Sequence, residues 1–241
     1  MNNSVVSKIT NSSTRKSLFH FTRVRNLASI VNLNSLYACE QVDPALSNGR
    51  RTMRRDIQFH GNVFIANAHL RIADQMMDPH TTQEQFYHYL DQHVFFWPTP
   101  KDCQKMLEIY TRREPGESFA ILQLHAEALL HDFYNGVKLS KYDSGSSPRF
   151  PNRCSYKKSL QMFLPLGLFG QVADSIVPSK PSEIREVLVK EKVSNMSHYL
   201  EAVYSHHAEE IPERWSTYAQ TFQDFYMRFV NKSNLPIQNK S

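Results

Sequence analysis

The sequence predicts a single domain of the α+β class. Expected strands and helices follow one another without the regular alternation that builds a parallel βαβ sheet, and no linker or internal repeat divides the 241 residues. A chain of this length buries an apolar core without disulfides, and its 41% hydrophobic content is ordinary for a globular protein. We therefore expect one folded domain over residues 17–230, between flexible tails at 1–16 and 231–241.

The first elements are predicted from short apolar patterns. LFHFT, at 18–22, has the alternation of a short strand, and the apolar residues of 26–33 recur on one face of a helix. Residues 42–56 form a polar, arginine-rich connection that starts at an Asp-Pro turn signal. A further short strand is expected at 63–66.

The middle of the chain is expected to contain two helices and two strands. A helix over 81–92 precedes the aromatic strand HVFFW at 93–97, which is stopped by a proline. A helix then runs over 101–110 and a strand over 119–124. The Gly, Ser and Pro content of 145–153 is typical of a loop.

The last third is expected to contain one strand and two helices. EIREVLV, at 183–189, has the composition of a strand, and a helix is expected over 194–207. Aromatic residues recur at spacings of three and four over 212–230, which predicts an amphipathic helix. This helix is expected to dock on the core, with partner binding as the alternative.

Basic residues are concentrated in the first quarter of the chain. Residues 1–60 contain nine Lys or Arg and three Asp or Glu, and Arg50, Arg51, Arg54 and Arg55 form the centre of this cluster. The whole chain has a net charge of +5 and an isoelectric point of about 9.0. Such a cluster suits a polyanion, either a dinucleotide pyrophosphate or a nucleic acid backbone. A solvated loop is equally compatible with it.

Several other classes of site are not supported by the sequence. The dinucleotide motif GxGxxG, the phosphate-binding motif GxxxxGK[ST] and the nucleophile motif GxSxG are absent. The eleven histidines and three cysteines lack the spacing of a zinc site, so we expect no metal. The three cysteines are too widely spaced for a disulfide framework, and no apolar stretch is long enough to span a bilayer. We expect a cytoplasmic protein that does not associate with membranes.

Glu186 is the most informative candidate for chemistry. In a strand it shares a face with Ile184 and Leu188, so a carboxylate stands among apolar residues. Burying an ionised carboxylate without a partner costs free energy. Either this carboxylate is aimed into a functional cleft, or it belongs to an edge strand and reaches solvent.

Two further features are compatible with ligand binding and with simple packing. His20 shares a strand face with Thr22, so imidazole and hydroxyl lie side by side, although a core histidine is the more frequent outcome. The aromatic strand 93–97 either belongs to the core or presents rings that stack on a base or nicotinamide.

Taken in order, LFHFT, NLASIVNLNSL, the arginine-rich connection, HVFFW and IREVLV resemble the DarT-type ADP-ribosyltransferases and a related bacterial group with a VFFW motif. The resemblance spans about residues 18–200 and depends on order and spacing. It implies a split mixed sheet with flanking helices around a cleft for NAD, the co-substrate. By the same resemblance, His20 holds NAD near the nicotinamide ribose beside Thr22, Arg51 or Arg54 contacts NAD, and Glu186 is catalytic.

The resemblance also implies an activity. The expected reaction is mono-ADP-ribosylation of a base in single-stranded nucleic acid, either RNA or DNA. Such enzymes often act as toxins of bacterial toxin–antitoxin or phage-defence systems, which implies a cognate antitoxin as partner. The alternatives are an ADP-ribosyltransferase that modifies protein, a nucleic-acid-binding module without catalysis, and a simple NAD glycohydrolase.

Overall fold

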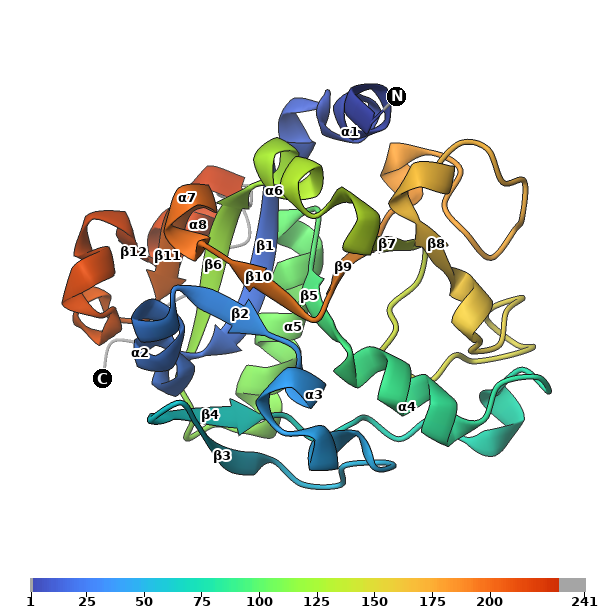
Figure 1. The fold of residues 1–241 in the computed structure, drawn as a ribbon, viewed down its shortest axis with the longest axis horizontal. Coiled ribbons are helices and arrows are strands. Elements are labelled where there is room, and N and C mark those ends of the chain that lie inside the picture. The colour runs from blue at the N-terminus through green and yellow to red at the C-terminus, as the bar shows by residue number, and fades with distance from the viewer. Residues whose placement is uncertain (1, 230–241) are drawn as a thin grey trace.

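A computed structural model describes residues 2–229 of the chain. The fold mixes helices with antiparallel sheets, which confirms the predicted α+β class. Two four-stranded sheets form the centre of the molecule, and helices surround them (Figure 1).

The first four-stranded sheet has the order β1-β6-β11-β12. Strand β6 pairs with β1 and with β11 in antiparallel fashion, whereas β11 and β12 are parallel. These strands are β1 (Ser17–Arg23), β6 (Phe119–His125), β11 (Leu200–Ser205) and β12 (Ala219–Thr221).

The second four-stranded sheet has the order β5-β9-β7-β8 and is antiparallel throughout. These strands are β5 (His93–Phe96), β7 (Val137–Ser140), β8 (Phe163–Pro165) and β9 (Glu186–Lys190). Strand β9 is internal, because β5 and β7 pair with its two edges.

The two large sheets are joined by backbone hydrogen bonds at one pair of residues. The N–H of Phe19 donates to the carbonyl of Trp97 at 2.9 Å, and the N–H of Trp97 donates back to Phe19 at 2.8 Å. Beyond this bridge β1 and β5 are not paired with each other. The centre of the fold is therefore a split sheet, as the resemblance implied.

Two small antiparallel sheets complete the strands, and each has two strands. One pairs β2 (Ser35–Tyr37) with β10 (Lys192–Ser194), and the other is the hairpin of β3 (Arg55–Phe59) and β4 (Asn62–Ala66). The hairpin turn consists of His60 and Gly61, with φ of 47° and 72°. A two-residue turn with both φ values positive matches the right-handed twist of the strands.

Side-chain caps mark the beginnings of α4 and α5. Thr82 and Gln85 form a capping box on α4, and Thr99 caps α5 with Pro100 in the first position. The helices are α1 (Asn2–Thr10), α2 (Val24–Leu33), α3 (Cys39–Val42), α4 (Gln83–Asp91), α5 (Pro100–Arg113), α6 (Ala126–Asp132), α7 (Met196–Tyr199) and α8 (Phe222–Phe229). Short 3₁₀ helices lie at Ser13–Arg15, Pro44–Ser47, Asp74–Met76, Tyr134–Gly136, Leu160–Met162, Leu166–Leu168, Pro181–Glu183, Ala208–Glu210 and Glu213–Tyr218.

The N-terminal segment is folded, so the predicted flexible tail over 1–16 is wrong for the described residues. Residues 2–10 form α1, which lies against α6 at the top of Figure 1. Val6 and Ile9 are buried in the main core. Val5 packs against the same core, and such tertiary packing of apolar side chains stabilises a short helix. The predicted tail over 231–241 lies outside the described residues.

The predicted helix over 194–207 is also wrong. Only Met196–Tyr199 is helical, and the following residues form β11, the strand between β6 and β12. From Ala202 to Ser205 every residue is buried. Pairing with two neighbouring strands outweighs the weak local preference of this segment for a helix.

The long amphipathic helix predicted over 212–230 is broken into three elements. Glu213–Tyr218 is a 3₁₀ helix, β12 follows, and only Phe222–Phe229 is α-helical. The chain turns into α8 at Thr221, whose hydroxyl accepts from the N–H of Asp224 at 3.3 Å. The apolar spacing reflects two separate contacts, because Trp215 enters the main core and Phe225 a second aromatic core.

Candidate active-site cleft

A cleft of about 300 Å³ opens where the two large sheets separate. Strand β1 lines one side, and β5 and the first residue of β9 line the other. The rest of the lining comes from helices α4 and α5, residues 65–70, residues 143–146, and Asn26, Tyr37, Cys39 and Arg51. Most of the accessible lining is apolar, with a few polar groups, which is typical of a small-molecule site.

Glu186 occupies the beginning of β9, opposite Ser140 of β7. The predicted strand over 183–189 thus starts three residues later, after the 3₁₀ helix Pro181–Glu183. Val187 and Val189 face the main core, while Glu186 lines the cleft and is only 3% exposed. An edge-strand glutamate that reaches solvent is therefore ruled out.

The Glu186 carboxylate is bound by the backbone of a neighbouring loop. The N–H of Ser144 donates to Oε2 of Glu186 at 3.1 Å. Burial raises the pKa of Glu186 to about 8, and the negative charge of Asp143 acts in the same direction. Hydrogen bonds from Ser144 and the positive charge of Lys158 oppose this rise. This carboxyl group therefore exchanges its proton near neutral pH.

His20 lies on β1 and its ring is held by the other sheet. Its Nδ1 lies 2.8 Å from the carbonyl oxygen of Phe95. Since a carbonyl only accepts, Nδ1 carries the proton and Nε2 is left as an acceptor. Burial lowers the pKa of His20 to about 4, so the ring is neutral at physiological pH. Thr22 lies two residues further along the same strand and also lines the cleft.

Arg51 lines the cleft, but its guanidinium group is fully hydrogen-bonded to other groups of the protein. Both terminal nitrogens bind the carboxylate of Asp91, at 3.0 and 3.1 Å. The remaining donors reach the carbonyls of Asn67 and Leu46, at 2.6 and 3.2 Å, and the Sγ of Cys39 at 3.6 Å. All five N–H groups have a partner, so Arg51 fastens the arginine-rich connection to α4.

Arg54 lies outside the cleft. Its Nη1 forms ion pairs with Glu117 at 3.1 Å and Glu114 at 3.4 Å, and its side chain is 49% exposed. The structure thus brings together four of the five predicted site residues, His20, Thr22, Arg51 and Glu186, but not Arg54.

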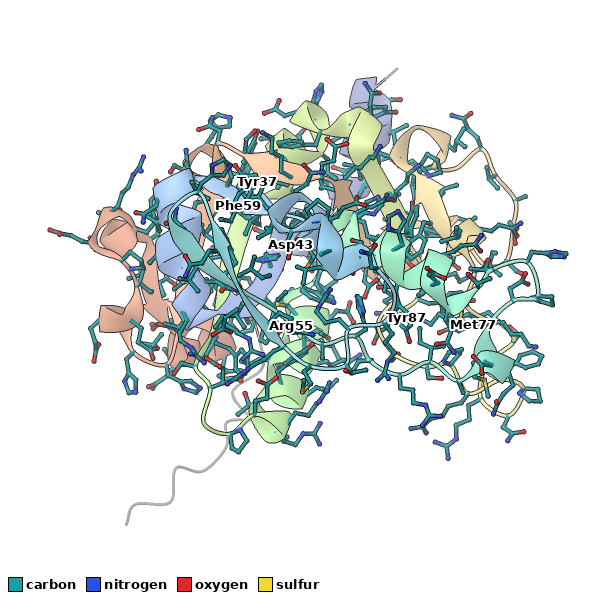
Figure 2. The ribbon with its side chains drawn as sticks, turned by 60° about the horizontal axis from the view of Figure 1, so that its bottom comes forward. Tyr37, Asp43, Arg55, Phe59, Met77 and Tyr87 are labelled. Atoms are coloured by element: carbon teal, nitrogen blue, oxygen red, sulfur yellow. The ribbon has the colours of Figure 1, made fainter. Side chains whose placement is uncertain are left out.

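The other two arginines of the cluster line a separate groove. This groove, of about 790 Å³, runs along residues 42–58 and includes Arg50 and Arg55. Both side chains belong to exposed residues. Figure 2 shows Arg55 and Asp43 on this side of the molecule, with Tyr37 next to Phe59. The concentrated positive charge predicted from the sequence is therefore shared between a buried ion pair and an open surface.

The aromatic strand at 93–97 contributes side chains to both the core and the cleft. Val94 and Phe96 are buried in the main core, whereas His93, Phe95 and Trp97 line the cleft, which Val94 also reaches. This division follows from the alternation of side chains along a strand.

Other cleft residues had no sequence signal. Tyr87, labelled in Figure 2, stacks on His69 with ring centroids 4.7 Å apart. Ser144 lies next to a segment that the sequence identified only as a loop. Long-range contacts bring these side chains to the cleft, so local patterns do not reveal them.

Two kinds of feature were not found among the described residues. Over 2–229, no group of three or more His, Cys, Asp or Glu side chains is arranged to hold a metal ion. None of the helices in this range is both long and apolar enough to cross a membrane.

Comparison with known proteins gave one family and several solved structures. Residues 16–200 match a family described as a family of unknown function (DUF7002). No curated protein matched the sequence. The chain is similar to structures of DarT from Thermus sp. 2.9, each at 14% identity.

Three of these DarT structures carry ligands. The complex with NAD⁺ has a TM-score of 0.44 and covers 88% of this chain and 98% of that one. The complex with carba-NAD⁺ has a TM-score of 0.43, with 86% and 92% covered. The complex with ADP-ribosylated ssDNA has a TM-score of 0.41, with 85% and 89% covered.

Proposed function

We propose that this chain, which belongs to the DUF7002 family, cleaves NAD and transfers its ADP-ribose to a base of single-stranded nucleic acid. The observation that carries the proposal is a buried carboxylate, Glu186, that lines the same cleft as the neutral imidazole of His20, at the split between two sheets. A carboxyl group with a strongly perturbed pKa in a cleft is a candidate for catalysis.

Glu186 has the properties that this chemistry requires. Breaking the bond between nicotinamide and ribose leaves positive charge at C1′ of the ribose, which an ionised carboxylate in a dry site stabilises. The same carboxylate accepts a proton from the attacking nitrogen of the acceptor. Both roles belong to the ionised form, and a pKa of about 8 leaves that form accessible near neutral pH.

Other residues of the cleft suit the rest of the nucleotide. We propose that Nε2 of His20 and the hydroxyl of Thr22 bind hydroxyl or amide groups of NAD. Phe95 and Trp97 offer ring surface for an aromatic base. Arg51 is bound to Asp91 and to other groups of the protein, so it has no donor left for the pyrophosphate.

The acceptor is proposed from surface charge. The groove along residues 42–58 carries Arg50 and Arg55 as exposed cations, and Arg51 lines both the groove and the cleft. A polyanion bound in this groove passes close to the cleft, and single strands expose the nitrogens of their bases. We also propose that the enzyme is a toxin of a toxin–antitoxin or phage-defence system, with a cognate antitoxin protein.

The test uses labelled NAD. The purified protein is incubated with labelled NAD and cell lysate, and the product is digested separately with RNase, DNase and protease. We expect that one of the two nucleases removes the label and that protease does not remove it. Label removed only by protease would indicate a protein acceptor, and equal nicotinamide release without lysate would indicate a glycohydrolase. Unchanged NAD would overturn the proposal and leave a binding module.

A matched pair of variants tests the assigned carboxylate. Glu186→Gln should abolish transfer while NAD binding, measured by calorimetry, is retained. Glu191→Gln, which changes a solvent-exposed carboxylate just beyond the same strand, should transfer at the parent rate. If Glu186→Gln turned over NAD normally, the assignment of the catalytic residue would be wrong.

A further inference from the structure

Lys158 is a buried cation that the proposed reaction does not use. Its exposed fraction is 0%. Its backbone is fixed on both sides, because its N–H donates to Met76 at 2.9 Å and its carbonyl accepts from Asp78 at 2.8 Å. Burying an ammonium group costs free energy unless acceptors surround it, so its placement calls for a functional reason.

The ammonium of Lys158 and the carboxylate of Glu186 bind opposite ends of one peptide group. Nζ of Lys158 donates to the carbonyl oxygen of Asp143. The N–H of the same peptide group, that of Ser144, donates to Oε2 of Glu186. Lys158, Ser144 and Glu186 are all buried residues.

This arrangement has two physical consequences. A cation at the carbonyl end polarises the peptide group, which makes its N–H a stronger donor, since hydrogen bonds in a chain strengthen one another. The hydrogen bond from Lys158 also fixes the plane of the peptide group, so the N–H stays directed at the carboxylate. Both effects favour the ionised form of Glu186.

We propose that Lys158 is a positioning residue for Glu186, and that it acts through the single peptide group between Asp143 and Ser144. It holds the N–H that binds the carboxylate and so keeps Glu186 oriented and ionised for its reaction. This inference rests on the proposed function only for the catalytic role of Glu186.

The charges around Glu186 determine whether its pKa rises or falls when Lys158 is replaced. Asp143 raises the pKa of Glu186 and Lys158 lowers it, while Tyr156 interacts with both Glu186 and Asp143. Burial in turn lowers the pKa of Lys158 to about 8, and Asp143 and Glu186 oppose that fall. The other titratable or charged side chains that line the same cleft are those of His20, Arg23, Tyr37, Cys39, Arg51, His69, Tyr87, Asp91, His93 and Tyr110.

The decisive measurement needs no NAD. The amide resonance of Ser144 is followed by NMR as a function of pH in the full-length protein, because it reports the protonation of Glu186 directly. In Lys158→Met we expect the inflection to move to higher pH and the amide proton to move upfield. A rise of one pKa unit lowers the ionised fraction of Glu186 at pH 7 about tenfold, so transfer should fall by a similar factor there and recover toward pH 9.

Two variants serve as controls. Lys157→Met removes the neighbouring cation, which lies over the ring of Phe150, and should leave the Ser144 inflection unchanged. Asp143→Asn removes an opposing charge and should move the inflection to lower pH. An inflection that stays at the parent pH in Lys158→Met would overturn the proposal.

A second measurement covers the case in which Lys158→Met does not fold. The pKa of Lys158 is read from its side-chain ¹⁵N resonance in the parent and in Glu186→Gln. Because the coupling is reciprocal, loss of the Glu186 charge should lower the pKa of Lys158, and an unchanged value would contradict the inference. A parent protein that shows the coupling but no turnover of NAD would overturn the proposed function alone.

Discussion

Arg51 and Asp91 form a buried bidentate ion pair that joins the arginine-rich connection to the end of α4. Nη2 lies 3.0 Å from Oδ1 and Nη1 lies 3.1 Å from Oδ2, with side-chain exposures of 6% and 4%. His69 also approaches Oδ1 of Asp91, with its Nε2 at 3.1 Å. Burial acts to raise the pKa of Asp91, but the hydrogen bonds from His69 and Arg51 outweigh it and the pKa is lowered.

Removing the charge of Asp91 should destabilise the fold. Asp91→Asn leaves the Arg51 guanidinium buried without a counter-charge, for which we expect a loss of about 3–5 kcal/mol in the free energy of unfolding. Urea denaturation measures it. Arg54→Ala, which removes a half-exposed partner of Glu114 and Glu117, should cost no more than about 1 kcal/mol. Equal midpoints for Asp91→Asn and the parent would contradict a stabilising role for the pair.

The rate of NAD cleavage should rise with pH and reach half of its maximum near pH 8. Only the ionised form of Glu186 stabilises the developing positive charge, and burial raises the pKa of this group to about 8. The profile of kcat/KM, measured from nicotinamide release between pH 6 and 9.5, reports the free enzyme. The kcat profile should turn at a lower pH, since the positive nicotinamide ring of bound NAD favours the ionised carboxylate. A rate that is constant below pH 7 would contradict this assignment.

The same carboxyl group should make stability fall as pH rises. The folded pKa of Glu186 lies above the unfolded value of 4.5, so between these pH values the folded state holds a proton that the unfolded state has lost. Its contribution is full below pH 4.5 and is lost as pH rises through about 8.

Glu186→Gln isolates that contribution. At pH 9 the variant should exceed the parent in unfolding free energy by at least about 1.4 kcal/mol, the equivalent of one pKa unit. At pH 4.5 the difference should be much smaller. Chemical denaturation at both pH values measures the two differences in unfolding free energy. If the difference between variant and parent were no larger at pH 9 than at pH 4.5, ionisation of Glu186 would not destabilise the folded state.

NAD affinity should not depend on the protonation of His20 near neutral pH. Burial lowers the pKa of this ring to about 4, so the neutral form binds throughout the range from pH 5.5 to 8. Calorimetry with Glu186→Gln, which prevents turnover, should give a constant Kd over this range. In that background His20→Ala should weaken binding about tenfold, equivalent to ~1.4 kcal/mol. The exposed His88 of α4 is the control, and His88→Ala should bind like its parent.

Much of the local structure is predictable from neighbouring residues. Strands β1 and β5 follow from the alternating aromatic runs around His20 and Phe95, and α5 follows from its cap at Thr99 and the proline after it. Glu186 stands out because a carboxylate within an apolar strand is costly unless it has a function or a partner. These signals operate within one element, where side-chain direction is set by the strand or helix period.

The tertiary structure decided what depends on partners far away in the chain. Residues 200–205 form a strand because β6 and β12 lie on either side, and no local pattern shows those neighbours. Four arginines look equivalent in the sequence, yet only Arg51 meets Asp91 and is buried with it. Likewise, Lys158 and Glu186 are linked by hydrogen bonds to one peptide group because three separate segments of the chain converge there. Composition and period determine which elements form, whereas burial and hydrogen bonding across the fold determine which charges are kept and what they contact.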